Sequence, residues 1–216
     1  MLLQNEEQVL KYIENLIPDR SEAFKEIEQY AVEHDVPIME LVGIETLLQL
    51  LRMHQPKKIL EIGTAIGYSA LRMAEALPEC KVVSVERDEQ RHNKALENVE
   101  TMNMSSQVFL IKGDALEVEH LVREHGPFDV LFIDAAKSQY RKFFDIYSKM
   151  LSPNGVIFTD NILFHGLVAE EKIESRNLRQ LIRKIKEFNI WLMEHPDYHT
   201  AIMPVGDGLA ISKKRG

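Results

Sequence analysis

Short apolar runs alternate with longer stretches of helical periodicity from residue 58 to residue 188. Each apolar run has the composition of a buried strand, and each following stretch repeats its apolar residues at helical spacing. The predicted strands cover residues 59–62, 81–85, 108–111, 128–133 and 156–159. The predicted helices cover residues 68–77, 88–102, 115–124, 137–151 and 175–188. Strands that alternate with helices predict a parallel sheet with helices on both faces.

Three further helices are predicted before the first strand, and prolines separate them. Asn5 and Asp19 are the predicted N-caps of the first two helices. These helices either cover the sheet or form a dimer surface. A chain of 216 residues is long enough for one sizeable domain and short for two. We therefore expect a single domain, with residues 1–55 as a helical cover and residues 56–216 as an α/β core.

The chain closes with a predicted β-hairpin. Residues 199–205 and 209–212 resemble strands, and they flank the sequence Gly206-Asp207-Gly208, which is typical of a tight turn. Residues 153–155, Pro-Asn-Gly, predict another turn before the strand at 156–159. The hairpin adds antiparallel strands to one edge of a mostly parallel, doubly wound sheet.

Composition narrows the class of protein. The formal net charge of -8 does not indicate nucleic-acid binding, so any such role requires a local basic patch. Cys80 is the only cysteine, which rules out an intramolecular disulfide and a cysteine-rich metal site, and fits a reducing compartment. The amino-terminal residues contain no long apolar run. We expect a cytoplasmic protein without a signal peptide, a transmembrane segment or a membrane partner.

A glycine turn follows the first predicted strand, in the stretch KILEIGTAIGYSA from Lys58 to Ala70. Strand, glycine turn and helix form the unit that binds nucleotide-like ligands at the carboxyl end of a parallel strand. The spacing of Gly63 and Gly67 differs from the G-x-G-x-x-G of dinucleotide binders, which disfavours a nicotinamide dehydrogenase. Glu61, two residues before the first glycine, favours a cationic ligand. The alternative is an ordinary strand-to-helix turn that tolerates Glu61.

Carboxylates stand at the ends of five successive predicted strands. They are Glu61, Glu86, Asp114, Asp134 and Asp160. One such residue can be a helix N-cap, but clustered carboxylates repel one another unless a cation holds them. Glu86 lies about 20 residues beyond the glycine turn, where an acid accepts hydrogen bonds from ribose hydroxyls.

The last two strand ends predict a metal site. Asp134, Asp160 and Asn161 offer only oxygen donors, which favours Mg²⁺ or Mn²⁺ over zinc. Lys137 lies one helical turn after Asp134 and is a candidate general base, because an ammonium near a divalent cation loses its proton more easily; alternatively, it is a surface lysine. A non-catalytic binding module would have little reason to keep these four residues together.

The segments EIGTAIGYS, VERD, GDA, FDVLFIDAAKSQY and the DN pair of FTDN occur in this order. Together they resemble the metal-dependent O-methyltransferases, a family that includes catechol and caffeoyl-CoA O-methyltransferases and uses S-adenosylmethionine. The resemblance implies the class I methyltransferase fold, with seven strands and a reversed last strand. It implies a cofactor site at Met39, Glu61, Gly63, Gly67, Tyr68, Ser69, Glu86, Asp114, Ala115 and Asp134. It also implies metal ligands at Asp134, Asp160 and Asn161, with Lys137 beside the metal.

The resemblance also suggests a substrate. The chain is most similar to bacterial members that methylate the 5-hydroxyl of 5-hydroxyuridine in tRNA to give 5-methoxyuridine. That hydroxyl adjoins the 4-keto oxygen, and a cation bound to two neighbouring oxygens lowers the pKa of the hydroxyl. A small catechol-like or caffeoyl-like molecule meets the same requirement and is the alternative. Phe164 stands where caffeoyl-CoA enzymes have a tryptophan, which argues against a phenylpropanoid pocket.

A basic stripe on the helix at 175–188 agrees with a tRNA substrate. Its residues lie three or four positions apart and so share one helix face. They are Arg176, Arg179, Arg183 and Lys186. The alternative is an ordinary solvated face of an amphipathic helix. We also expect a homodimer.

Overall fold

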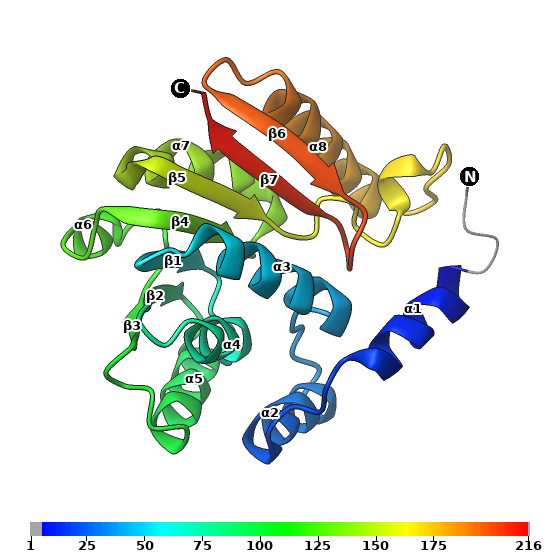
Figure 1. The fold of residues 1–216 in the computed structure, drawn as a ribbon. Coiled ribbons are helices and arrows are strands. Elements are labelled where there is room, and N and C mark those ends of the chain that lie inside the picture. The colour runs from blue at the N-terminus through cyan, green and yellow to red at the C-terminus, as the bar shows by residue number, and fades with distance from the viewer. Residues whose placement is uncertain (1–5, 216) are drawn as a thin grey trace.

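The computed structural model describes residues 6–215 and places seven strands in one sheet (Figure 1). The strands are β1 (Lys58–Ile62), β2 (Lys81–Glu86), β3 (Val108–Lys112), β4 (Phe128–Ile133), β5 (Leu151–Thr159), β6 (Tyr198–Met203) and β7 (Leu209–Lys214). Their order is β3-β2-β1-β4-β5-β7-β6, and β7 runs antiparallel to both of its neighbours. The predicted doubly wound sheet with a reversed last strand is confirmed. Because the strand order reverses between β1 and β4, a ligand crevice is expected at their carboxyl ends.

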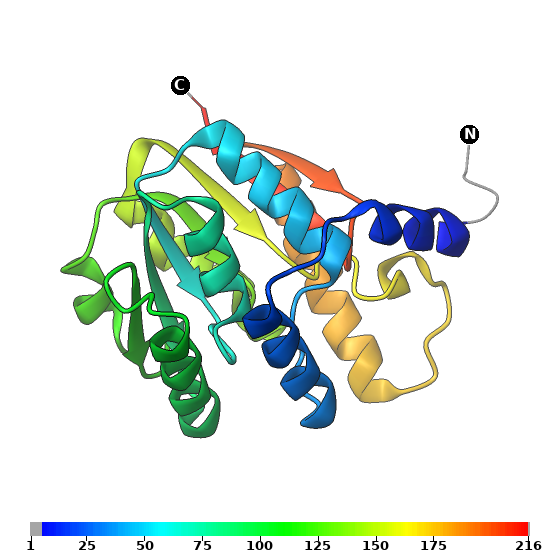
Figure 2. The same cartoon turned by 60° about the horizontal axis from the view of Figure 1, so that its bottom comes forward.

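Helices cover both faces of the sheet (Figures 1 and 2). They are α1 (Glu6–Leu16), α2 (Glu22–Glu33), α3 (Leu41–His54), α4 (Tyr68–Ala76), α5 (Glu89–Thr101), α6 (Glu119–Arg123), α7 (Tyr140–Tyr147) and α8 (Arg176–Met193). The described residues also form three short 3₁₀ turns, η1 (Lys137–Gln139), η2 (Ser148–Met150) and η3 (Leu167–Ala169). Within residues 6–215, no helix combines the length and the apolar character needed to cross a membrane.

Two apolar cores follow from the alternation of side chains along the strands. On β1, Ile59 packs into the core under α2, α3, α4 and α5. Leu60 and Ile62 point the other way, into the core with α6, α7 and α8. Full burial of one such side chain contributes roughly 1.5–3 kcal/mol. The strands are therefore apolar on both faces, and polar residues collect where the strands end.

Two predicted helices differ from the structure. The helix expected at 115–124 is shorter, because the Asp114 carboxylate accepts a hydrogen bond from the Leu116 amide in a turn before α6 begins. The helix expected at 137–151 is divided into η1, α7 and η2, and Leu151 already belongs to β5. The predicted turn at 153–155 thus lies inside β5, next to a register shift between Phe128 and Val130 on β4.

The predicted helix caps also need correction. Ser21, not Asp19, is the N-cap residue of α2, and its side chain makes no capping hydrogen bond. Asp19 instead lies 3.7 Å from the Lys25 ammonium. The predicted cap Asn5 lies outside the described residues.

Candidate functional site

A cavity of about 510 Å³ opens at the carboxyl ends of the parallel strands. Most of the predicted site residues line it: Met39, Gly63, Glu86, Asp114, Ala115, Asp134, Lys137, Asp160 and Asn161. Residues that the sequence did not single out as site residues line it as well, among them Glu40, Arg87, Arg91, His165 and Asp207. The fold thus brings segments from the whole chain to the crevice that the strand order predicts.

Gly63 allows the close approach of β1 and β4 at this cavity. Its backbone φ angle is +105°, a conformation that residues with a side chain rarely adopt. A Cβ atom at this position would lie 1.9 Å from the Asp134 carbonyl oxygen. Any other residue would therefore separate the glycine turn from the strand end that carries Asp134.

Glu61 lies behind the glycine turn and is fully buried. Its carboxylate accepts hydrogen bonds from the hydroxyls of Ser69 and Ser84, and the Thr64 hydroxyl lies 2.6 Å from that of Ser84. Burial raises the pKa of Glu61 to about 7, although both serine hydroxyls oppose the shift. The carboxylate fastens the turn to β2 and α4.

Four of the predicted cofactor residues do not line the cavity. They are Glu61, Gly67, Tyr68 and Ser69. Glu61 and Ser69 bond to each other beneath the turn, and the Tyr68 hydroxyl donates to Glu28 on α2. Gly67, with a φ of +86°, is the N-cap residue of α4. Their contacts shape the turn that bounds the cavity.

Glu86 ends β2 at the cavity wall. Its two carboxylate oxygens accept backbone hydrogen bonds from Ala65 at 2.9 Å and from Asp88 at 2.8 Å. Each oxygen has a second lone pair that remains available to a ligand. On the same wall, the Arg87 guanidinium lies 3.6 Å from the Asp114 carboxylate.

The structure brings Asp134, Asp160 and Asn161 together. The Asn161 side-chain nitrogen lies 3.3 Å from Oδ1 of Asp134 and 2.8 Å from Oδ2 of Asp160. Burial raises the pKa of Asp134 to about 6 and the pKa of Asp160 to about 7. Two buried carboxylates this close are costly when both are ionised, unless a cation offsets their charge.

Asp207, which the sequence indicated only as a turn residue, joins this group from the β6–β7 hairpin. Its Oδ1 accepts a hydrogen bond from the His165 amide. Its Oδ2 and Oδ1 of Asp160 are both buried, and neither has a hydrogen-bond partner among residues 6–215. The signal in the sequence was an acid between two glycines, in a turn that the topology places at the strand ends.

These residues fit a divalent cation with oxygen ligands. The buried, unpartnered Oδ1 of Asp160 is an acceptor that such an ion would satisfy. A half-turn of the Asn161 amide would present its oxygen in place of its nitrogen. No three His, Cys, Asp or Glu side chains among the described residues are grouped as a metal site by themselves. The amide oxygen would therefore be needed as the third ligand.

Lys137 reaches the same part of the cavity from η1. The residues between Asp134 and Lys137 are not helical, so the lysine does not stand one α-helical turn beyond the carboxylate. Its ammonium lies 5.5 Å from the centre of the Phe164 ring. Its positive charge opposes the rise in the pKa of Asp134 and of Asp160, which places it within electrostatic reach of both carboxylates.

Fold and site together define a class of protein. A doubly wound sheet with a reversed seventh strand, a glycine turn after β1 and an acid at the end of β2 is the class I fold of S-adenosylmethionine-dependent methyltransferases. The sequence profile of the O-methyltransferase family matches residues 14–215. The chain belongs to the O-methyltransferase family, whose members use S-adenosylmethionine.

Three similar proteins illustrate the relationship. A Staphylococcus aureus structure provisionally assigned as a caffeoyl-CoA O-methyltransferase is 37% identical, with a TM-score of 0.89 over 98% of this chain and 99% of that one. A catechol O-methyltransferase from Niastella koreensis is 31% identical over 95% of this chain and 96% of its own. The O-methyltransferase TomG from Streptomyces achromogenes, in complex with S-adenosylmethionine, covers both chains fully at 24% identity and a TM-score of 0.82. This last likeness shows the fold.

Proposed function

We propose that this protein transfers the methyl group of S-adenosylmethionine to a hydroxyl that adjoins a second oxygen, with Mg²⁺ or Mn²⁺ held by Asp134, Asp160 and Asn161. The observation that carries the proposal is the buried, unpartnered Oδ1 of Asp160 beside Asp134 and Asn161, in a cavity that also contains Lys137. Two adjacent substrate oxygens are the natural partners of a divalent cation with open positions.

The cofactor fits the part of the cavity bounded by the glycine turn, Glu86 and Asp114. Gly63 leaves room for the methionine end, Glu86 can accept from the ribose hydroxyls, and Asp114 with Ala115 borders the adenine. Met39 closes this part from the α2–α3 connection. The surrounding carboxylates favour the positively charged sulfonium of the donor.

Glu86→Gln should weaken S-adenosylmethionine binding at least about tenfold, because a charge-assisted hydrogen bond contributes roughly 1.5–3 kcal/mol. Calorimetry on the folded variant measures the loss. Glu89→Gln is the matched control, since Glu89 is exposed on α5 and pairs with Lys112. Unchanged affinity in Glu86→Gln would remove Glu86 from the cofactor site.

The chemistry follows from the positions of the side chains. A bound cation would lower the pKa of the substrate hydroxyl. A cation held beside Lys137 would also favour the neutral amine, which in that form could accept the proton of the hydroxyl. The Phe164 ring lies 5.5 Å from the lysine nitrogen. Methyl transfer then requires the oxygen and the sulfonium methyl in line, a geometry that a preformed cavity favours.

For the natural acceptor we propose the 5-hydroxyl of 5-hydroxyuridine in tRNA, and the place of α8 supports it. Asn189 on α8 donates a 2.8 Å hydrogen bond to the Ile162 carbonyl, just beyond the metal site. Arg176 begins the helix thirteen residues earlier. At 1.5 Å per residue, the helix therefore extends about 20 Å from Asn189 to its first residue, Arg176. The same end of α8 stands beyond the sheet in Figure 2.

The basic stripe on this extension suits phosphates on either side of an inserted base. Arg176, Arg179, Arg183 and Lys186 are all exposed. Arg183 pairs with Glu187 at 3.6 Å, whereas the other three have no carboxylate within ion-pair distance among residues 6–215. A small molecule bound in the cavity would not reach these cations.

Charge reversal at Arg179 and Arg183 should raise the Michaelis constant for hydroxyuridine-containing tRNA and leave that for a free catechol unchanged. Phosphate contacts release counterions, so binding of tRNA to the wild type should also weaken steeply with salt. The matched control is the double reversal Arg52→Glu/Lys57→Glu, which changes the net charge equally at exposed positions near the amino end of β1. Labelled cofactor measures both reactions. Methylation of catechols, with hydroxyuridine-containing tRNA left untouched at low salt, would contradict the tRNA proposal.

A small catechol-like or caffeoyl-like acceptor is the second candidate. It is favoured by the names of the Niastella koreensis and Staphylococcus aureus relatives. Such acceptors also carry the neighbouring oxygens that the proposed metal site requires. The two candidates differ in whether the α8 stripe affects the Michaelis constant for the acceptor, which the charge reversal measures.

We further propose a homodimer formed through α1, which projects from the body of the fold (Figure 1). This helix exposes 64% of Tyr12 and 63% of Leu16, with Leu10 and Ile13 also exposed. An apolar helix face of this kind favours burial against a second copy. Tyr12→Glu/Leu16→Glu should therefore yield a monomer by light scattering. A wild type that is monomeric at micromolar concentration would contradict this proposal.

A further inference from the structure

One wall of the cavity comes from the N-terminal helices. Pro37, Ile38, Met39 and Glu40 line the cavity, and all four lie in the connection between α2 and α3. The glycine turn that precedes α4 also lines the cavity, at Gly63 and Ala65. The width of the cofactor site therefore depends on how α2 and α3 are held against α4.

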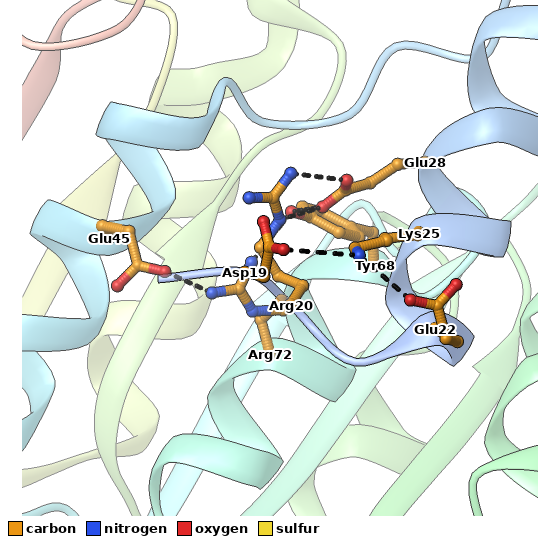
Figure 3. Close-up of polar contacts among 8 residues, drawn as sticks. All are labelled: Asp19, Arg20, Glu22, Lys25, Glu28, Glu45, Tyr68 and Arg72. Carbon is orange, nitrogen blue, oxygen red and sulfur yellow. Dashed lines mark hydrogen bonds and ion pairs between the residues drawn. The ribbon is translucent and has the colours of Figure 1, made fainter. Parts of the chain in front are cut away.

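A polar cluster joins these elements (Figure 3). It consists of Arg20, Glu28, Glu45, Tyr68 and Arg72, and we call it the helix-joining cluster. At its centre the Tyr68 hydroxyl donates to Glu28 at 2.7 Å and accepts from Arg72 at 2.9 Å. One hydroxyl thus links α2 to α4.

Charge reinforces this link on both sides. Arg20 binds both oxygens of Glu28 at 2.9 Å, and Arg72, which is 4% exposed, donates to Glu45 on α3. Burial raises the pKa of Glu28, but the hydrogen bonds from Arg20 and Tyr68 outweigh it and hold that pKa below its usual value. The Arg72 guanidinium also lies 5.2 Å from the centre of the Phe24 ring on α2.

On its other side α2 contacts α5 through the Lys94 ammonium, which lies 4.6 Å from the centre of the Tyr30 ring. A hollow of about 500 Å³ separates α2 from α5, and it is lined mainly by polar and charged side chains. The cluster, with the edge-on contact of Phe24 and Tyr68 at 6.1 Å, adds directional contacts to the buried side chains of Phe24, Ile27 and Ala31 that attach α2 to the core.

We propose that Tyr68 and Glu28 are positioning residues for the cofactor site. They hold the wall at 37–40 at its working distance from the glycine turn, and they do so without lining the cavity. Tyr68 stands in the GYS segment that the resemblance assigns to cofactor contact, yet its hydroxyl serves the joint between helices. This inference rests on the proposed use of S-adenosylmethionine.

Two conservative variants and their combination test the proposal. Tyr68→Phe removes the linking hydroxyl and keeps the ring, while Glu28→Gln removes the charge and keeps the shape. Glu22→Gln is the matched control, because Glu22 lies on the same helix in an exposed pair with Lys25 (Figure 3). Calorimetry gives the affinity for S-adenosylmethionine at a temperature at which circular dichroism shows every variant folded.

Each single variant should weaken cofactor binding about three- to thirtyfold, the range expected for residues coupled to a site that they do not touch. The double variant should lose little more than either single one, because both break the same link. The turnover number at saturating cofactor should stay at the wild-type value, whereas a general loss of structure would lower it.

Two results would overturn the inference. Folded single variants that bind the cofactor as tightly as the wild type would show that the cluster only stabilises the fold. Losses that add fully in the double variant would show that Tyr68 and Glu28 act separately. Failure of the wild type itself to bind S-adenosylmethionine would instead overturn the proposed function, and this inference with it.

Discussion

Removal of divalent cations with EDTA should abolish methyl transfer, and addition of Mg²⁺ or Mn²⁺ should restore it. The reason is the set of Asp134, Asp160 and Asn161 at adjacent strand ends, with a buried oxygen of Asp160 that lacks a partner among residues 6–215. In proteins, oxygen donors of this kind hold hard divalent cations.

Asp160→Asn tests the site itself. It removes a charge and keeps the shape, and it should weaken metal binding by more than the roughly 10- to 100-fold typical of residues around a ligand shell. Asp145→Asn is the control, because Asp145 lies exposed on α7. Calorimetry with Mg²⁺ reports affinity independently of turnover. Full activity of metal-free protein in excess EDTA would exclude a metal-dependent mechanism.

Lys137→Met should lower turnover about 10²- to 10⁴-fold, the usual contribution of a positioned acid–base group. Methionine keeps much of the length and apolar character of the side chain, so the packing against Phe164 should survive. The affinity for S-adenosylmethionine should change little, because the lysine lies beside the proposed metal site and not beside Glu86.

Lys142→Met provides the comparison, because Lys142 is exposed on α7, close by in the sequence. Initial rates at saturating cofactor and acceptor measure the effect. If Lys137→Met retains wild-type turnover, Lys137 does not accept the proton, and its proximity to the carboxylates has only an electrostatic role.

The sequence predicts the core well for a physical reason. Buried parallel strands must be apolar along their whole length, so β1 and β4 stand out from the helices between them. The ends of these strands can also be recognised in the sequence, because carboxylates such as Asp134 directly follow an apolar run. The sheet then brings these ends together, which explains why most predicted residues line one cavity.

Contacts between distant segments could not be predicted from periodicity. From the sequence, Asp207 is predicted only as a turn residue. In the structure, the antiparallel pairing of β7 with β5 brings its hairpin to the ends of the parallel strands. The link between Glu28 and Tyr68 joins residues 40 positions apart in the sequence. The division of the helix at 137–151 likewise depends on the early pairing of Leu151 with Phe128.

The acceptor is the feature on which the two proposed functions differ. The family relationship establishes O-methyl transfer, and the relatives carry names of small aromatic substrates. The stripe on α8 is the local feature of this chain that favours a larger, anionic substrate. A helix face of charged residues is common on protein surfaces. The charge reversal at Arg179 and Arg183 therefore tests whether this face binds phosphates.

The central claim is that the acceptor hydroxyl must adjoin a second oxygen. Transfer of a labelled methyl group from S-adenosylmethionine, compared between catechol and phenol in the presence of Mg²⁺, tests it most directly. We expect label in catechol and none in phenol, with the catechol signal lost in Asp160→Asn. Equal labelling of catechol and phenol, or labelling of catechol that persists in Asp160→Asn, would contradict the account.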